Sequence, residues 1–422
     1  MGLPVRFLFV GILAASCLMK CALAQNTYTW QQLRDKFEAN NPTLLAARIA
    51  IDESRAQEIT AYLRPNPDVT ATVDQIDPFP DPFSNFPYRP LSMSLPLVSA
   101  NYLHERQHKR ELRRESAQKM TAITASQTAD QERNLLFNLR NGFVQTLQQK
   151  AVLVVATDSL AYYDRLLTVS RDRFRDGDIS RVDLLRLELQ RVQFETDVQT
   201  AKVNLRTARI QLLALLNDRT SVDDFDVIGP FDFPDQVSPL EEYRGIALAT
   251  RPDLKAAMQT VDKAQTDHRL AVANGSTDPT FGVDFARNPP IPVYFGVSVT
   301  IPLRIFDRNQ GEKLRTQQDI AHSERLRDAN QAEVFSDVDA AYAMIISNLA
   351  LLRPYKSTYL QQAVDVRETL SYAYQRGGAS LLDFLQAQQD YRSIQLNYVN
   401  LIGSYFTAAN QLNLAVGREV IR

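Results

Sequence analysis

Cysteine is nearly absent from this chain. Its 422 residues include two cysteines, Cys17 and Cys21, and both lie in the first 24 positions. This segment has the features of a secretory signal, with a basic Arg6, an apolar stretch and a small-x-small cleavage pattern ending at Ala24. We therefore expect residues 1–24 to be a signal peptide and the mature chain to lack disulfides and thiol chemistry. The alternative is a lipoprotein acylated at Cys17.

The chain also lacks a strong charge of one sign and a long apolar run. Because the signal holds Arg6 and Lys20 of the 47 basic residues, the mature chain carries 45 basic and 49 acidic residues, a net charge of −4. This balance gives no indication of nucleic-acid binding. Beyond the signal, no apolar run approaches the roughly 20 residues of a membrane-spanning helix. A secreted chain of this kind can still enter a membrane as strands.

Glycine and proline are scarce along most of the chain and concentrated in a few places. Thirteen of the 20 prolines fall within Pro65–Pro96 and Pro279–Pro302. From Pro96 to Gly177 the sequence is broken by Gly142 alone, and from Gly177 to Gly229 by neither residue type. Such long unbroken patterns predict coiled-coil helices rather than a compact domain. A helix of roughly 80 residues before Gly177 would extend about 120 Å.

The two proline-rich windows alternate apolar and polar residues, as strands do. Each window predicts one hairpin, with strands about ten residues long, enough to cross a bilayer at a tilt. Four strands cannot close a membrane barrel, which needs about eight, so several chains would have to pool them. The apolar members of the expected strands are Val69, Ala71, Val73, Leu91, Met93, Leu95, Phe281, Val283, Phe285, Val297, Val299 and Ile301.

The stretch after Ser180 carries two apolar seams. From Leu184 to Leu215 apolar residues recur in steps of three and four, interrupted by Arg191, which is the 3.5-residue repeat of left-handed supercoils. A helix with two seams can contact a neighbour on each side, which favours a ring of helices over one helix buried in an ordinary bundle. The second, weaker seam comprises Val182, Leu185, Leu189, Val192, Val203, Ile210 and Leu213.

The chain also repeats itself. The segment from Arg173 to Leu185 matches the segment from Ala373 to Leu385 without a gap, with Gly, Ser, Asp and Leu in register. Two shorter pairs agree, and we infer an internal duplication of about half the chain. These pairs are Asn41–Ala47 with Arg251–Ala257, and Leu95–Leu97 with Ile301–Leu303. The expected organisation is a signal peptide at 1–24, a first repeat at 25–217, a linker at 218–240 and a second repeat at 241–422.

Each copy of the longest match predicts the tip of a helical hairpin. A glycine suits the left-handed residue that ends one helix, and a serine three positions later suits the N-cap of the next. An aspartate three residues further completes a capping box and complements the helix N-terminus. The residues concerned are Gly177, Ser180 and Asp183 in the first copy and Gly377, Ser380 and Asp383 in the second.

From Trp30 to Gly417 the chain resembles the outer-membrane efflux channel family, the TolC-like exit ducts of tripartite pumps. The resemblance rests on Asn-Pro-x-Leu at Asn41, Arg-Pro-Asp-Leu at Arg251, the repeated tip motif Gly-x-x-Ser-x-x-Asp-hydrophobic-Leu, and the order helix, hairpin, long helix, tip, long helix given twice. It implies a mainly α fold with a small β part, in which a homotrimer pools twelve strands into an outer-membrane β-barrel above a periplasmic α-barrel of coiled-coil helices. It also implies a periplasmic adaptor, an inner-membrane transporter of RND type or similar, and outer-membrane lipid as partners, without a cofactor.

The resemblance also assigns roles to the tips. Gly177, Ser180, Gly377, Gly378 and Ser380 are expected to dock the adaptor. The residues expected at the periplasmic aperture are Asp183, Asp383, Tyr374 and Gln386. The chain departs from the family at two positions, because Gln386 replaces a second acid and Ala379 replaces the arginine that partners the aperture tyrosine. The segment from Leu63 to Pro67 is similar to the heavy-metal-exporting branch.

Two other interpretations compete with the channel. The segment from His104 to His108 fits H-E-x-x-H, in which two histidines on one helical face bind zinc and Glu105 activates water, as in a metalloprotease. The charged run from Lys109 to Arg114 that follows argues against a catalytic cleft. The second alternative is a periplasmic adaptor, but adaptors carry one helical hairpin and more strand. We therefore predict a non-enzymatic channel that conducts substrates passively from the periplasm to the exterior.

Overall fold

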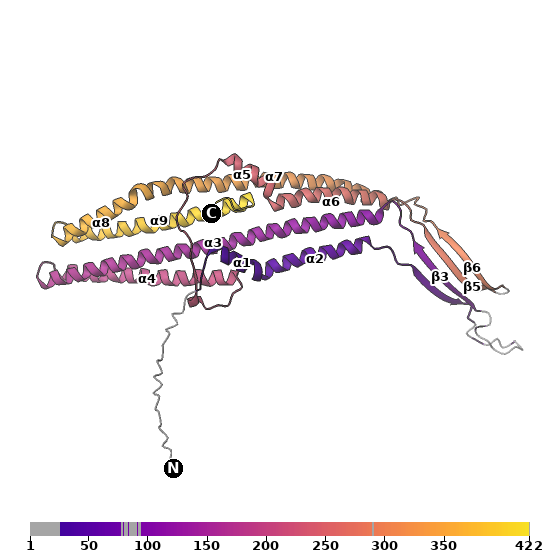
Figure 1. The fold of residues 1–422 in the computed structure, drawn as a ribbon, viewed down its shortest axis with the longest axis horizontal. Coiled ribbons are helices and arrows are strands. Elements are labelled where there is room, and N and C mark those ends of the chain that lie inside the picture. Colours follow the sequence, from indigo (N-terminus) through magenta and orange to yellow (C-terminus); the bar gives the residue numbers. More distant parts are fainter. Residues whose placement is uncertain are drawn as a thin grey trace, which may run out of the picture.

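A computed structural model describes residues 26–76, 79, 83, 91, 94–288 and 291–421. The molecule is elongated: long helices run side by side along its long axis, and the strands extend from one end at an angle to them (Figure 1). The expected signal peptide, with Cys17 and Cys21, lies outside the described residues, and so does Met93.

The chain passes twice through the same series of elements. Each pass has a short helix, a longer helix, two strands and a long helical hairpin. The first pass comprises β1 (Asn26–Tyr28), α1 (Trp30–Asn40), α2 (Pro42–Tyr62), β2 (Asp68–Asp74), β3 (Leu95–Leu103), α3 (Lys109–Arg175) and α4 (Arg181–Leu215).

A short connection precedes the second pass. It holds the 3₁₀ turn η1 (Val222–Asp224) and β4 (Phe225–Val227), which pairs in parallel with β1. The second pass comprises α5 (Leu240–Thr250), α6 (Pro252–Asn274), β5 (Thr280–Asn288), β6 (Ile291–Thr300), α7 (Gln310–Pro354), the π-helical turn η2 (Tyr355–Tyr359), α8 (Leu360–Gln375) and α9 (Leu381–Val416). The boundaries at 217 and 240 stay a prediction.

The four longer strands form one antiparallel sheet in the order β2-β3-β5-β6. The two hairpins are joined through β3 and β5, so β2 and β6 are the edges of the sheet. The side chains of the strand residues Val69, Phe285 and Val297 are more than half exposed. An apolar sheet with two open edges is suited neither to water nor to lipid unless further strands are added.

The ends of two strands differ from the expectation. The second strand of the first hairpin is β3, from Leu95 to Leu103, so Leu91 stands in a turn before it. In the second hairpin β6 ends at Thr300, and Ile301 follows it. Apolar alternation runs past the strand end in both cases, whereas pairing with the neighbouring strand decides where the strand begins and ends.

The match between Leu95–Leu97 and Ile301–Leu303 is likewise not structural. The first segment begins β3, whereas the second follows β6. The long helices, by contrast, begin at Lys109 and Gln310 and keep the spacing seen at the tips. A short Leu-Pro-Leu match is therefore too small a motif to place the repeat.

The helices form a single curved row rather than a compact globule. Next to the strands α2 packs on α3, α3 on α6 and α6 on α7. Towards the tips α4 packs on α3, α3 on α9 and α9 on α8 (Figure 1). The sides of the row are therefore α2 and α7 in one half and α4 and α8 in the other. These sides continue the sheet edges β2 and β6.

Helix α3 is 67 residues long, about 100 Å at 1.5 Å per residue. It is shorter than the helix expected from the sequence, because the first residues of that expected helix form β3 and the turn before Lys109. The expected seam of α4 packs against it, with Arg191 paired to Asp164 at 2.6 Å. The buried seam residues are Leu187, Phe194, Val198, Ala201, Leu205, Ala208 and Leu212.

The second seam of α4 faces outward. Leu213 is buried near the middle of the molecule, but the other six residues are between 48% and 73% exposed. They are Val182, Leu185, Leu189, Val192, Val203 and Ile210. An apolar stripe of this length on one helix indicates a surface that another helix covers.

One helical stretch, Gln310–Gln375, contains a window long and apolar enough to cross a membrane by length and composition. That window belongs to α7, whose Val338, Ile345 and Leu349 pack in the largest core cluster. The apolar residues of this window lie on two surfaces of α7. One surface packs on α9, and the other lies on the exposed side of the helical row.

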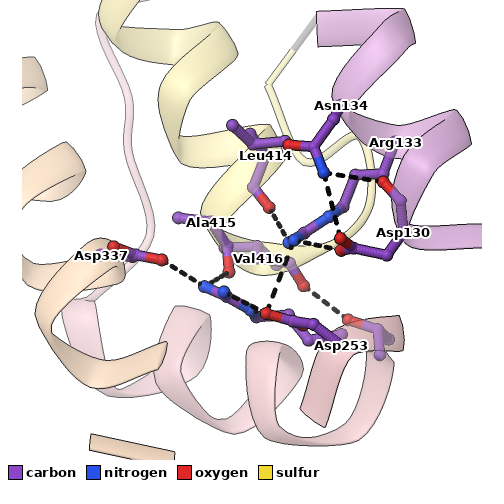
Figure 2. Close-up of polar contacts among 10 residues, drawn as sticks. Asp130, Arg133, Asn134, Asp253, Asp337, Leu414, Ala415 and Val416 are labelled. Carbon is purple, nitrogen blue, oxygen red and sulfur yellow. Dashed lines mark hydrogen bonds and ion pairs between the residues drawn. The ribbon is translucent and has the colours of Figure 1, made fainter. Parts of the chain in front are cut away.

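Near the middle of the molecule, polar side chains bind the carboxyl end of the last helix of each repeat. The guanidinium of Arg251, 4% exposed, donates to the carbonyl of Ala415 at 3.2 Å and pairs with Asp253 and Asp337 at 2.5 and 2.7 Å (Figure 2). Arg133 of α3 donates to the carbonyl of Leu414 at 2.6 Å. Arginines at the carboxyl end of α9 satisfy carbonyls that have no partner within the helix and complement its dipole.

The first repeat has the same type of contact to a helix end, but a neutral side chain makes it. Asn41, like Arg251, precedes the proline that begins a helix, and its side-chain amide donates to the carbonyl of Leu215 at the end of α4, at 3.3 Å. Each repeat therefore joins its early turn to the end of its last helix. This explains the Asn-Pro and Arg-Pro segments of the sequence.

Replacing Arg251 by Met is expected to destabilise the protein by about 2 kcal/mol, because it leaves Asp337 and the carbonyl of Ala415 without this partner, whereas Asp253 keeps Arg133 at 3.7 Å. Arg55→Met is the matched control, since Arg55 is 66% exposed and pairs with Asp52 one turn away; its loss should cost under about 1 kcal/mol. Thermal unfolding in detergent measures both variants. Equal melting temperatures for the two would contradict this role of Arg251.

Candidate functional site

The first hairpin tip has the geometry that its sequence predicts. Gly177 adopts φ = 86°, in the left-handed region, and ends α3. A tight turn follows, closed by the amide of Asp178, which donates to the carbonyl of Arg173 at 2.9 Å. Ser180 then caps α4, accepting a hydrogen bond from the amide of Asp183 at 3.1 Å.

The second tip repeats this turn between α8 and α9. Gly377 adopts φ = 77°, and the amide of Gly378 donates to the carbonyl of Ala373 at 2.8 Å. Ser380 caps α9, and Asp383 completes the capping box. Both tips lie at the end of the molecule away from the strands (Figure 1). The capping roles expected of Gly177, Ser180, Gly377, Ser380 and Asp383 are confirmed, whereas the first tip has the serine cap without the capping box expected at Asp183.

Asp183, which is half-buried, and Asp383, which is exposed, lie just inside the tips. The hydroxyl of Ser180 donates to Asp183 at 2.8 Å, and that of Ser380 donates to Asp383 at 2.7 Å. Both carboxylates thus stabilise a helix start and place a negative charge there. Gln386 is exposed one turn further and donates to Asp390 at 2.8 Å.

Tyr374 lies inside the wall near the tip rather than on its surface. It is 6% exposed and stacks on Phe384, with ring centroids 5.1 Å apart. Ala379, at the family's arginine position, packs against the same apolar cluster. Burial raises the pKa of Tyr374, and among the described residues its hydroxyl has no hydrogen-bond partner.

An arginine that the sequence did not single out holds this tyrosine. Arg173 of α3 donates to the carbonyl of Tyr374 at 2.9 Å, and its guanidinium lies 5.5 Å from the tyrosine ring. The bond joins the two hairpins close to their tips. In the sequence Arg173 stands two positions from Arg175, which is 76% exposed, and nothing in the pattern distinguishes the two.

Further contacts of the same kind join the hairpins above the tips. The guanidinium of Arg367 in α8 lies 4.3 Å from the ring of Tyr162 in α3 and 3.8 Å from that of Tyr391 in α9. Arg392 of α9 pairs with Asp197 of α4 at 2.5 Å. Stacked and paired arginines therefore connect the hairpins beside an apolar cluster that both hairpins share, in which Tyr374 and Phe384 pack with residues of α3 and α4.

The zinc-site alternative fails on geometry. His104 follows the end of β3 and His108 stands in a left-handed turn before α3, so the two do not share a helical face. Glu105 forms a two-bond pair with Arg113, at 2.5 and 2.7 Å. Within the described ranges no group of three or more His, Cys, Asp or Glu could hold a metal ion.

Part of the sequence matches a known protein family. Residues 244–418 match the model of the outer membrane efflux protein family. The chain is similar to this family over its second repeat. It is 23% identical to the cobalt-zinc-cadmium resistance protein CzcC of Cupriavidus metallidurans over 388 residues, which cover 90% of this chain and 87% of the relative.

Solved structures share the whole fold. A membrane protein from Pseudomonas aeruginosa superposes with a TM-score of 0.75 at 14% identity, covering 92% of this chain and 90% of that one. The outer membrane protein VceC of Vibrio cholerae gives 0.73 at 15% identity, covering 93% and 97%. The MtrE outer membrane channel of Neisseria gonorrhoeae, in its open state, gives 0.73 at 16% identity, covering 93% and 90%.

These comparisons place the chain in the bacterial outer membrane, with a long helical periplasmic portion. The family is one of TolC-like efflux channels and not of enzymes. The family model covers the second repeat, and the first repeat has the same element order.

Replacing Arg173 by Met is expected to loosen the link between the hairpins, because a charge-assisted hydrogen bond to a carbonyl contributes about 1.5 kcal/mol. Amide hydrogen exchange around Tyr374 should then accelerate by about tenfold, since 1.4 kcal/mol corresponds to a factor of about ten. The control is Arg175→Met at the same tip. If both variants exchange at the wild-type rate, Arg173 has no holding role.

Proposed function

We propose that this protein is the outer-membrane exit duct of a tripartite efflux or secretion system. Three copies would form the duct and conduct substrates passively from the periplasm to the exterior. A periplasmic adaptor and an inner-membrane transporter, of RND type or similar, would supply cargo and energy. The observation that carries the proposal is the open, apolar, four-stranded sheet whose edges β2 and β6 continue into the sides of the helical row.

The edges suggest how copies would join. Backbone groups at β2 and β6 need partners inside lipid, and the exposed seam of α4 needs an apolar surface. At the opposite side of the row, α8 exposes Val366 and Tyr372, which are 50% and 56% exposed. Pairing α4 with α8 of the next copy, and β2 with β6, would close the ring with twelve strands.

The adaptor would dock on the tips formed by Gly177, Ser180, Gly377, Gly378 and Ser380. These turns are exposed at the end of the molecule and are held in one conformation by their caps. The aperture would lie just inside, with Asp183, Asp383 and Gln386 around it, and the buried Tyr374 would support the wall behind them. Three copies of each aspartate would form a negative ring that concentrates cations.

Divalent metal cations are the cargo that the comparisons favour. CzcC is named for resistance to cobalt, zinc and cadmium, and the match with it covers most of both chains. The proposed acidic ring is compatible with cationic cargo. The rival cargo classes are organic drugs and polypeptides. Zinc and drug sensitivity of cells with and without the protein, in the presence of its own pump partners, would separate them.

Conductance of the detergent-extracted protein in a planar bilayer tests the channel directly. Discrete, cation-preferring steps are expected, and Asp383→Asn should lower the cation preference because it removes three charges from the mouth. The control is Asp390→Asn, two turns along α9. An unchanged cation preference in Asp383→Asn would remove Asp383 from the aperture, whereas a folded protein that never conducts would favour the adaptor alternative.

Replacing Leu189 by Glu is expected to weaken the trimer, because it places a charge in the exposed seam of α4, where Leu189 is 73% exposed in the single chain. Asn204→Glu, on an exposed position of the same helix outside both seams, is the control. Native mass spectrometry in detergent counts the copies. A Leu189→Glu variant as trimeric as its control would place the interface elsewhere.

A further inference from the structure

The apolar stripe of β6 does not stop where the strand stops. Every second residue from Val293 through Ile305 is apolar, although β6 ends at Thr300. The side chains beyond the strand remain uncovered: Leu303 is 81% exposed and Ile305 is 61% exposed. Their neighbour Phe306 is 91% exposed, at the start of the turn into α7.

The length of this stripe places its end at the membrane boundary. From Ile291 to Thr300 strand β6 rises about 30 Å at roughly 3.3 Å per residue, or about 23 Å along the normal at a tilt of about 40°. Leu303 and Ile305 follow in a tight turn, in which the amide of Ile305 donates to the carbonyl of Leu303 at 3.0 Å. The apolar band of an outer-membrane barrel is about 25 Å tall. Leu303 and Ile305 therefore fall at the edge of the band on the side of the helices.

Two arginines accompany these side chains. Arg304 lies between Leu303 and Ile305 in sequence, and Arg308 follows Phe306 by two positions. Neither arginine forms an ion pair with any described residue, whereas Lys109, in the corresponding turn of the first repeat, is buried and paired with Asp278 at 2.6 Å. Unpaired arginines beside exposed apolar groups match the phosphates and acyl chains at a lipid interface.

We propose that residues 301–308 form an interfacial anchor. Leu303, Ile305 and Phe306 enter the inner leaflet of the outer membrane, and Arg304 and Arg308 bind the phosphates of its phospholipids. The proposal rests on the membrane insertion of the sheet in the proposed function. The anchor sets the depth of the barrel and fixes the start of α7 against the membrane surface.

Two other junctions between helices and strands have the same composition. Leu63, 60% exposed, precedes an exposed Arg64 between α2 and β2. Leu103, 37% exposed, is followed by an exposed Arg106 between β3 and α3. Arginine and exposed leucine thus recur at three of the four junctions, which makes a collar around the membrane end of the helices.

The chain contains one tryptophan, Trp30, far from this collar in α1. A single-tryptophan variant, Trp30→Phe with Phe306→Trp, therefore reports on the anchor alone. In vesicles of brominated phospholipid its fluorescence is expected to be quenched, and aqueous iodide should have little effect. The wild type, with Trp30 in the periplasmic half, should show no quenching by brominated lipid.

A second single-tryptophan variant separates this proposal from the proposed function. Trp30→Phe with Phe295→Trp places the probe within β6 and should be quenched by brominated lipid if the sheet spans the membrane. Quenching at position 295 but not at 306 would overturn the anchor and leave the channel standing. Quenching at 306 by iodide alone, or by neither agent, would mean water or a neighbouring copy surrounds it. No quenching at 295 would contradict both.

The phosphate contacts are tested by removing the arginines. Arg304→Gln with Arg308→Gln is expected to lower the affinity of the trimer for phosphatidylglycerol by about twentyfold, since one arginine near an anionic surface contributes roughly fivefold. The matched control is Arg315→Gln with Arg325→Gln on α7, whose arginines are 61% and 87% exposed. Native mass spectrometry measures the bound lipid. Equal losses in both variants, or equal displacement by inorganic phosphate, would overturn lipid binding.

Discussion

The structure depends on a sheet that one chain leaves open. In water or lipid the backbone groups of β2 and β6 require partners, and a four-stranded sheet has no means of closing on itself. The helices also leave two sides without a partner, because they form one row whose sides continue the sheet edges. A curved row of long helices buries apolar residues only between neighbouring helices, so its exposed seams demand further copies. Because the chain is duplicated, each copy supplies two helical hairpins and two strand hairpins.

The duplication also requires that each repeat hold its two ends together. The early turn of a repeat binds the carboxyl end of its last helix, through Asn41 in one case and Arg251 in the other. The charged version gathers Asp253, Asp337 and Arg133 around the buried Arg251 at the middle of the molecule (Figure 2). The helical wall is therefore secured at its midpoint, which leaves the tips and the strands as its two free ends.

The tips and the strands differ in the side chains that they carry, because their surroundings differ. Near the tips, arginines stacked on aromatic rings connect the hairpins beside a shared apolar cluster, and the stacked contacts exchange with water more readily than apolar packing does. That composition suits a place where the wall opens and closes. At the strands the exposed side chains are apolar, and they continue past β6 towards a collar of arginines. That composition suits a surface fixed in lipid.

The sequence by itself determined the periods: strands of period two, seams of period 3.5, the repeated tip and its caps at Gly177, Ser180 and Asp183. Each depends on neighbours a few residues away, so local patterns contain the information. Tertiary structure alone decided where β3 begins and where β6 ends, because strand limits come from pairing partners far along the chain. It also decided that Arg173 rather than Arg175 turns inward to Tyr374, since adjacent arginines look alike until a second hairpin lies beside one of them.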